Sequence, residues 1–149
     1  MTTTDSILIR APRERVFALA AAVEEWPRIL PHSRSVTVLE GDQRRRLVAM
    51  HCVRPFGALN FPCRWRATQE LAPDEGSIRF THVAGPTRGM EVEWKLEETP
   101  EGVRTSIHHE LASRIPLYAE GIVGPVFIRN IAGRTLATIK AIAEREVAA

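Results

Sequence analysis

From Ser35 to Leu111, apolar and polar residues alternate with a period of two, which predicts β-strands with one buried and one solvent-facing side. The pattern is clearest from Met90 to Glu98, where every second residue is apolar and those between are charged. Turn-forming residues interrupt it at Gly41-Asp42, Pro55-Phe56-Gly57, Pro73-Asp74-Glu75-Gly76, Gly85-Pro86 and Pro100-Glu101-Gly102. Connections this short join antiparallel neighbours, so the sequence predicts a sheet built from hairpins.

Helical patterns flank this region. A short first strand over Ser6 to Arg10 ends at Ala11-Pro12, and apolar residues at three- and four-residue spacing then predict one amphipathic helix as far as Trp26-Pro27. Because Pro31 follows closely, the segment from Trp26 to His32 reads as a turn or a broken second helix. Pro116 and Gly124-Pro125 end the strand pattern, and helical spacing returns from about Val126 to Glu146, with an apolar stripe at Ile128, Ile131, Ile139 and Ile142.

These elements predict an α+β fold in which a curved antiparallel sheet of six to seven strands packs against a long C-terminal helix. The 149 residues match one domain, 1–149, which buries about 68–70% of its unfolded surface and needs no metal or disulfide to fold. The net charge of +2 gives no reason to expect nucleic acid as a partner. Without an 18-residue apolar run or a signal peptide, we expect no membrane span and a cytoplasmic location.

Most of the other local motifs have plain structural interpretations. Arg44-Arg45-Arg46 follows Gly41-Asp42 and reads as the solvated end of a hairpin rather than a phosphate-binding patch. Cys52 and Cys63 lack the spacing of metal ligands and read as small buried packing residues. No phosphate loop, dinucleotide fingerprint, zinc-protease or serine-elbow motif occurs, so we expect no metal and no cofactor. Any function must come from a pocket.

Several segments resemble the polyketide cyclase/dehydrase branch of the START/Bet v 1-like superfamily, whose fold is the helix-grip. The resemblance lies in Ile7 to Phe17 as first strand and helix start, Val23 to Pro27 as a segment ending in Trp-Pro, Cys63-Arg64-Trp65 around a pocket tryptophan, and Gly85-Pro86 followed by Met90 to Trp94. It spans nearly the whole chain. It implies that the long helix lies across the curved sheet and leaves a cavity between them.

Strand parity then selects the residues that face this cavity. The candidates for substrate binding are mainly aromatic residues and methionines: Trp26 and Leu30 near the mouth, and Met50, Trp65, Phe80, Met90, Trp94 and Thr105 on the strands. The polar groups available among them are Gln69, His82, Thr105 and His109. Plain core packing would produce the same pattern of aromatic residues.

His109 is the main candidate for acid/base chemistry, with Gln69 or His82 polarising a carbonyl. His109-Glu110-Leu111 resembles a stretch of the final strand where some cyclases carry a working histidine, and parity turns His108 outward. An inward histidine more often completes a core hydrogen bond, so the structural interpretation stays open beside the catalytic one. Gln69 stands where the family often has arginine, and its amide cannot supply a fixed positive charge.

The resemblance implies an aromatase/cyclase that promotes aldol cyclisation and dehydration of a polyketide chain, which an acyl carrier protein would hold. The alternative is a non-enzymatic carrier of a quinone or isoprenoid lipid, because Trp26-Pro27, Leu30-Pro31 and Ala132 to Leu136 also resemble the Coenzyme Q-binding branch. A sensor or chaperone-like module is a third reading. The sequence leaves the oligomeric state, including a homodimer, open.

Overall fold

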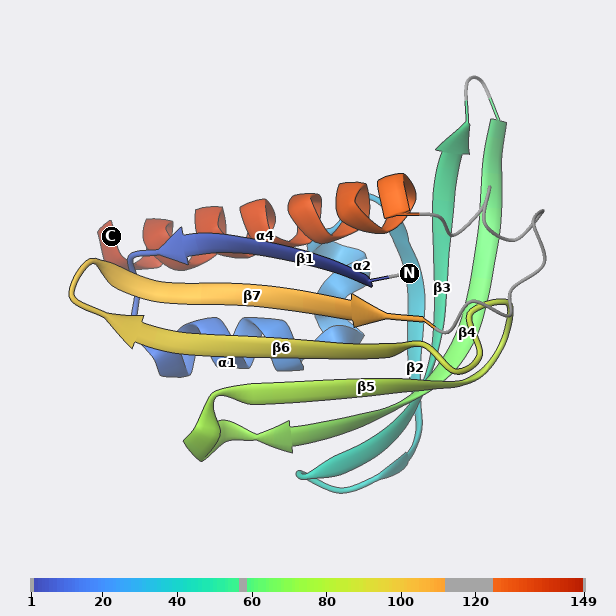
Figure 1. Ribbon diagram of the computed structural model, residues 1–149, viewed down its shortest axis with the longest axis horizontal. Helices are drawn as coiled ribbons and strands as arrows, with labels where there is room; N and C mark the ends of the chain where they lie inside the picture. The colour runs from blue at the N-terminus through green and yellow to red at the C-terminus, as the bar shows by residue number, and fades with distance from the viewer. Residues whose placement is uncertain (1, 57–58, 112–124, 149) are drawn as a thin grey trace.

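The computed structural model describes residues 2–56, 59–111 and 125–148, and seven strands in these ranges form one curved antiparallel sheet. The strands are β1 (Thr2–Ile9), β2 (Ser33–Gly41), β3 (Arg45–Phe56), β4 (Leu59–Ala72), β5 (Ser77–Ala84), β6 (Glu91–Thr99) and β7 (Gly102–Glu110), in the spatial order β1-β7-β6-β5-β4-β3-β2. The C-terminal helix α4 (Pro125–Ala148) lies along β1 (Figure 1). The predicted helix-grip fold is confirmed.

Between β1 and β2 the chain forms α1 (Arg13–Ala21), the 3-10 turn η1 (Val23–Glu25) and the single-turn helix α2 (Trp26–Ile29). Pro12 is the residue before α1, where its missing N–H costs no hydrogen bond. Leu30, before Pro31, has an extended backbone, so α2 stops there as the proline rule requires. The prediction of a broken second helix is therefore confirmed.

The turns at Gly41-Asp42, Gly85-Pro86 and Pro100-Glu101 fall at predicted breaks, and η2 (Pro73–Glu75) fills the one between β4 and β5. Pro55 and Phe56, which were also predicted to interrupt the strands, instead pair within β3, and Gly57 lies outside the described residues. Gly85 matters for the site because its φ of +106° is one that side chains rarely adopt. A Cβ at Gly85 would lie 2.6 Å from the Arg64 carbonyl oxygen and 3.0 Å from Trp65 Cα. Glycine there lets the turn after β5 lie directly against β4 beside Trp65.

The core lies between the sheet and α4, and its residues follow the predicted parity. Val92, Trp94 and Leu96 are buried on β6, while the charged residues between them face outward. On α4 the buried stripe consists of Ile128, Ala132, Thr135, Leu136, Ile139 and Ala143. Ile131 and Ile142, which were expected in this stripe, are only half-buried at its margins, because the helical repeat places Ala132 and Ala143 closer to the sheet.

Two predicted boundaries are wrong. The first strand begins at Thr2 rather than Ser6, because Thr2 to Asp5 pair with β7 through their backbones, and a backbone ladder does not require apolar side chains. The helix after it ends at Ala21, before the predicted Trp26-Pro27. The strand-ending residues Pro116 and Gly124 lie outside the described residues.

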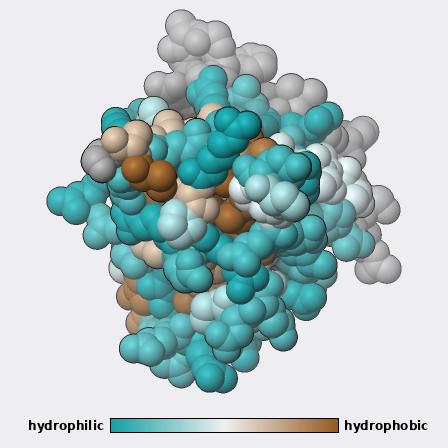
Figure 2. Space-filling view, turned by 90° about the vertical axis from the view of Figure 1, so that its left-hand side faces the viewer, coloured by the Kyte–Doolittle hydropathy of each residue, from teal (hydrophilic) through white to brown (hydrophobic). Residues whose placement is uncertain are grey.

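The outer surface near the C-terminal end of α4 is mostly hydrophilic, with hydrophobic residues in small separate patches (Figure 2). None of the helices in the described ranges is long and apolar enough to cross a membrane.

Cys52 and Cys63 are buried opposite each other on β3 and β4, as the packing interpretation expected. Burial, followed by the effect of Cys63, raises the pKa of the Cys52 thiol to about 12, so this thiol is unreactive at neutral pH.

Candidate functional site

A pocket lies between the inner face of β3 to β7 and the N-terminal half of α4, with a cavity volume of about 110 Å³. Its described lining is almost entirely apolar and aromatic: Trp26, Met50, Cys63, Trp65, Phe80, His82, Thr87, Met90, Val92, Trp94, Ile107, His109, Ile128, Ile131, Ala132 and Thr135. Eight of the eleven residues predicted for the site, including Trp26 from α2, thus meet around one space. The polar atoms at its wall come from His82, Thr87, His109 and Thr135.

Among the described residues, two contacts between aromatic rings lie in this wall. The Trp26 ring from α2 packs on the Trp94 ring from β6, with centroids 6.0 Å apart and planes tilted by 45°. The Trp65 ring stacks on the His82 imidazole, with centroids 5.4 Å apart and planes within 8° of parallel. The two contacts fix flat surfaces from different elements around the cavity, as a site for a flat ligand requires.

His82 is buried, and a hydrogen bond of 2.6 Å joins its Nδ1 to Thr87 Oγ1 in the turn after β5. Burial, followed by the nearby His109, lowers the pKa of His82 to about 3. The ring is therefore neutral at pH 7. The Thr87 contact fixes the orientation of this ring, and so of the face that it stacks on Trp65.

His109 on β7 is half-buried, and its Nδ1 is shielded from solvent with no hydrogen-bond partner among the described residues. Burial, followed by the charge of His108, lowers the pKa of His109 to about 4. His108 points to the other side of the sheet, where its Nδ1 lies 2.7 Å from Thr4 Oγ1. His109 thus brings a neutral imidazole with an unused nitrogen to the pocket wall.

Three predicted site residues do not line the pocket. Leu30 and Thr105 are 1% and 0% exposed and belong to the surrounding core, although Thr105 Oγ1 has no hydrogen-bond partner among the described residues. Gln69 is 0% exposed, and its amide is occupied at both ends by Arg46 and Ala21. The expectation that His109 lies beside Gln69 and Thr105 in the pocket is therefore wrong, because strand parity gives the face but not the position along the cavity.

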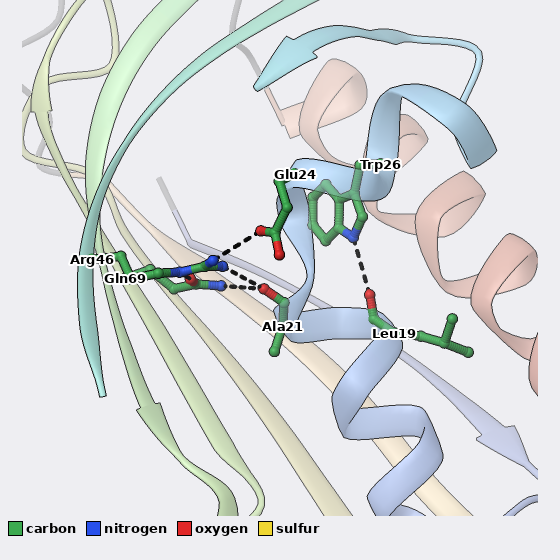
Figure 3. Close-up of polar contacts among 6 residues, drawn as sticks. All are labelled: Leu19, Ala21, Glu24, Trp26, Arg46 and Gln69. Atoms are coloured by element: carbon green, nitrogen blue, oxygen red, sulfur yellow. Dashed lines mark hydrogen bonds and ion pairs between the residues drawn. The ribbon is translucent and has the colours of Figure 1, made fainter. Parts of the chain in front are cut away.

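Arg46 is not solvated, contrary to what the arginine cluster predicts. Its side chain is only 16% exposed, and its Nη1 forms an ion pair of 2.9 Å with Glu24 Oε2 (Figure 3). It therefore does not belong to a solvated hairpin end. Arg46 shares the inward parity of Val48 and Met50 on β3, and this alternation separates it from Arg45, whereas Arg44 lies before the strand.

Metal chemistry has no obvious ligand set here. In residues 2–56, 59–111 and 125–148, no group of three or more histidine, cysteine or acidic side chains is placed to hold a metal ion. The polar side-chain groups that line the described pocket include the neutral imidazoles of His82 and His109 and the hydroxyls of Thr87 and Thr135, in apolar surroundings.

Comparisons with known proteins agree with this geometry. The model of the family described as polyketide cyclase/dehydrase and lipid transport matches residues 9–135. A protein of Streptomyces halstedii, named a candidate polyketide cyclase, is 34% identical over 106 residues, which cover 68% of this chain and 92% of that protein.

A longer relative and a solved structure extend the comparison. The actinorhodin polyketide synthase bifunctional cyclase/dehydratase of Streptomyces coelicolor is 27% identical over 141 residues, or 91% of this chain, but the match spans only 42% of that protein. The crystal structure of the Zhui aromatase/cyclase from Streptomyces sp. R1128 superposes with a TM-score of 0.84 at 18% identity, covering 99% of this chain and 95% of the other. At this identity the superposition establishes the fold alone.

Proposed function

The chain belongs to the polyketide cyclase/dehydrase and lipid transport family, and from that premise we propose that it closes a ring in a poly-β-ketone chain and removes water from the product. The observation that carries the proposal is the neutral imidazole of His109, which lines an apolar pocket and whose Nδ1 has no hydrogen-bond partner among the described residues. An unsatisfied polar atom in such a place is costly unless a ligand completes it.

The proposed reaction is an intramolecular aldol condensation. His109 takes a proton from a methylene between two carbonyls, and the resulting enolate carbon attacks a carbonyl carbon further along the same chain. One C–C bond forms as the C=O π bond of the attacked carbonyl breaks. The oxygen of that carbonyl then takes a proton and becomes a hydroxyl. Loss of a second α-proton together with that hydroxyl releases one water and leaves a C=C bond. Folding the chain so that the two carbons meet supplies much of the rate enhancement, and proton transfer adds about 10²–10⁴-fold.

The pocket wall supports this chemistry by its shape and dryness. A cavity of about 110 Å³ is near the size that accepts a single aromatic ring in other proteins, which is about 150 Å³. The cavity therefore suits the part of the chain that becomes the ring, with the remainder extending outside. Such an arrangement fits a substrate that stays attached to an acyl carrier protein, which we propose as the partner.

His82 takes the second role in this proposal. Its Nδ1 is committed to Thr87, which leaves Nε2 to hold a carbonyl or hydroxyl of the substrate. As a neutral imidazole that carries its proton on Nε2, it would donate a hydrogen bond to the oxygen on which charge develops. Gln69, the other residue expected to polarise a carbonyl, has no free amide atom for this task.

The test is an assay of product formation with a synthetic poly-β-ketone thioester, followed by liquid chromatography and mass spectrometry. We expect a product lighter by one water and a ring position different from that of the spontaneous reaction. Loss of this selectivity in His109→Gln supports the catalytic role. Recovery of the spontaneous product mixture with the native protein would contradict the proposal.

The second candidate is a carrier of an apolar lipid or quinone. It is favoured by the almost wholly apolar lining of the pocket, and the matching family includes lipid transport. A carrier needs cavity volume but no proton transfer. Its ligand therefore stays chemically unaltered in both the native protein and a His109 variant. Extraction of an unaltered isoprenoid from the purified protein, together with no turnover of polyketide thioesters, would favour this function.

A further inference from the structure

Two side chains from the sheet meet the end of helix α1. Arg46 and Gln69 lie directly opposite each other on β3 and β4, and Arg46 Nε donates a hydrogen bond of 2.8 Å to Gln69 Oε1. Arg46 Nη2 and Gln69 Nε2 each donate to the Ala21 carbonyl oxygen at 2.9 Å. Ala21 is the last residue of α1, so its carbonyl lacks a partner within the helix. The guanidinium thus caps this helix C-terminus, where a cation is favourable.

Arg46 also holds the segment after α1. Its Nη1 lies 2.9 Å from Glu24 Oε2 in η1, so all three guanidinium nitrogens have partners (Figure 3). The pair is partly shielded, with Arg46 and Glu24 side chains 16% and 39% exposed. A planar fork with every nitrogen engaged fixes the position of its partners more firmly than a flexible lysine would.

The same helix end holds a pocket residue. Trp26 Nε1 donates a hydrogen bond of 3.2 Å to the carbonyl oxygen of Leu19, which lies in the last turn of α1. Trp26 lines the pocket and packs on Trp94. A continuous path therefore runs from the sheet through Arg46 and the last turn of α1 to the Trp26 indole (Figure 3).

We propose that Arg46 is a positioning residue for the pocket, which places the Trp26 ring against Trp94 by holding the end of α1 and Glu24 on the sheet. Arg46 does not line the described pocket, so it acts through Trp26 rather than by touching a ligand. The consequence for ring closure rests on the proposed function: a Trp26 ring that moves should change the ratio of cyclised products more than it changes total turnover.

The test reads the tryptophan rings directly. The three tryptophans are labelled with 5-fluorotryptophan, and their fluorine resonances are assigned with Trp→Phe variants. In Arg46→Met we expect the Trp26 resonance to shift and broaden, with a smaller shift for Trp94. Trp65 packs on His82 and should keep its resonance, which separates a positioning effect from a general loss of structure. Arg46→Lys should restore part of the native Trp26 position.

Arg45→Met is the matched control, because Arg45 is the neighbouring residue, is exposed, and forms no ion pair among the described residues. If Arg46→Met does not fold, Glu24→Gln decides, since it removes the ion pair and leaves the bonds to Ala21 and Gln69. An unchanged Trp26 resonance in the folded variant would overturn the proposal, as would an equal shift of Trp65. Neither result bears on the cyclase function, because no substrate is present.

Discussion

At the residue scale, His109 and His82 share one environment but differ in what their nitrogens can do. Both pKa values are lowered chiefly by burial, so both rings are neutral at pH 7. His82 is anchored through Thr87, whereas His109 Nδ1 has no partner among the described residues. A ring that is already hydrogen bonded can orient a substrate, and one with an unused nitrogen can exchange a proton. Because of this difference, we expect the proton transfer at His109 rather than at His82.

The first prediction concerns that transfer. His109→Gln keeps hydrogen bonding but cannot carry a proton at neutral pH, so we expect turnover to fall about 10²-fold or more with ligand affinity little changed. His109→Ala should lose a similar factor. Single-turnover kinetics and ligand titration by tryptophan fluorescence measure the two quantities.

His108→Gln is the control for this experiment, because His108 is adjacent on β7 but contacts Thr4 on the opposite side of the sheet. It should retain native turnover. Full activity in His109→Gln would leave a pocket that works by shape alone, and unfolding of both His109 variants would assign His109 a structural role.

The second prediction is the pH range in which the pocket histidines titrate. With pKa values lowered to about 4 for His109 and about 3 for His82, neither ring should gain a proton between pH 8 and pH 5. The acid limb of the pH–rate profile should therefore fall below pH 5 rather than near 6.5. Histidine ¹H–¹⁵N correlation spectra recorded from pH 8 to pH 4 measure this directly. A midpoint near 6.5 for either ring would show that water reaches it.

At the scale of the elements, the sheet needs α4 to cover its inner face. Leu136 and Ile139 are 2% and 0% exposed at the centre of the helix stripe. Leu136→Ala or Ile139→Ala should lower the free energy of unfolding by about 2–5 kcal/mol, because each leaves a cavity in addition to the lost apolar burial. Denaturant unfolding measures this loss.

The matched control is Val147→Ala, since Val147 is 56% exposed at the end of the same helix and should change stability by less than about 0.5 kcal/mol. A chain truncated near Pro125 should not fold at all. Cooperative melting of that truncated chain at the native temperature would show that the sheet does not depend on α4.

The elements also show what period-two patterning can predict. In β6 the alternation of apolar and charged residues matches the buried and exposed faces, because one face of the strand packs in the core and the other faces solvent. In β1 the pattern fails before Ser6, since Thr2 to Asp5 are held by backbone pairing to β7. Arg46 was misjudged because a charge beside two other arginines reads as solvated. Its carboxylate and carbonyl partners lie 22 or more residues away in sequence, at Glu24 and Ala21, and only the fold brings them near.

At the scale of the whole molecule, parity identifies the inner face but not the pocket within it. Gln69 and Thr105 face inward as predicted, yet they lie in packed regions away from the cavity. The depth of a residue along a strand depends on how the sheet curves and where α4 crosses it, and neither is encoded in local alternation. Trp65, Phe80, Met90 and Trp94 line the pocket because they lie on the part of the sheet that faces the N-terminal half of α4.

The last prediction is the dependence of folding stability on pH. The pKa values of His82 and His109 are lowered in the folded state, and burial followed by Arg134 lowers that of His32 too. As the pH falls below about 6.5, these histidines gain protons in the unfolded chain before they do so in the folded protein. The unfolded state then binds more protons, so the free energy of unfolding should decrease from pH 6.5 towards pH 4.5.

Each of the two pocket histidines should contribute roughly 2 kcal/mol to this loss at pH 4.5. Urea unfolding at pH 7.5, 6.5, 5.5 and 4.5 measures the slope. The double variant His82→Asn with His109→Gln removes both titrating groups, and its profile should be flatter because only the contribution of His32 remains among these three. His108→Gln should leave most of the native slope, because burial, the larger cause of the lowered His109 pKa, is unchanged. An equal slope in the double variant and the native protein would mean that neither ring is desolvated in solution, and that the pocket is open to water.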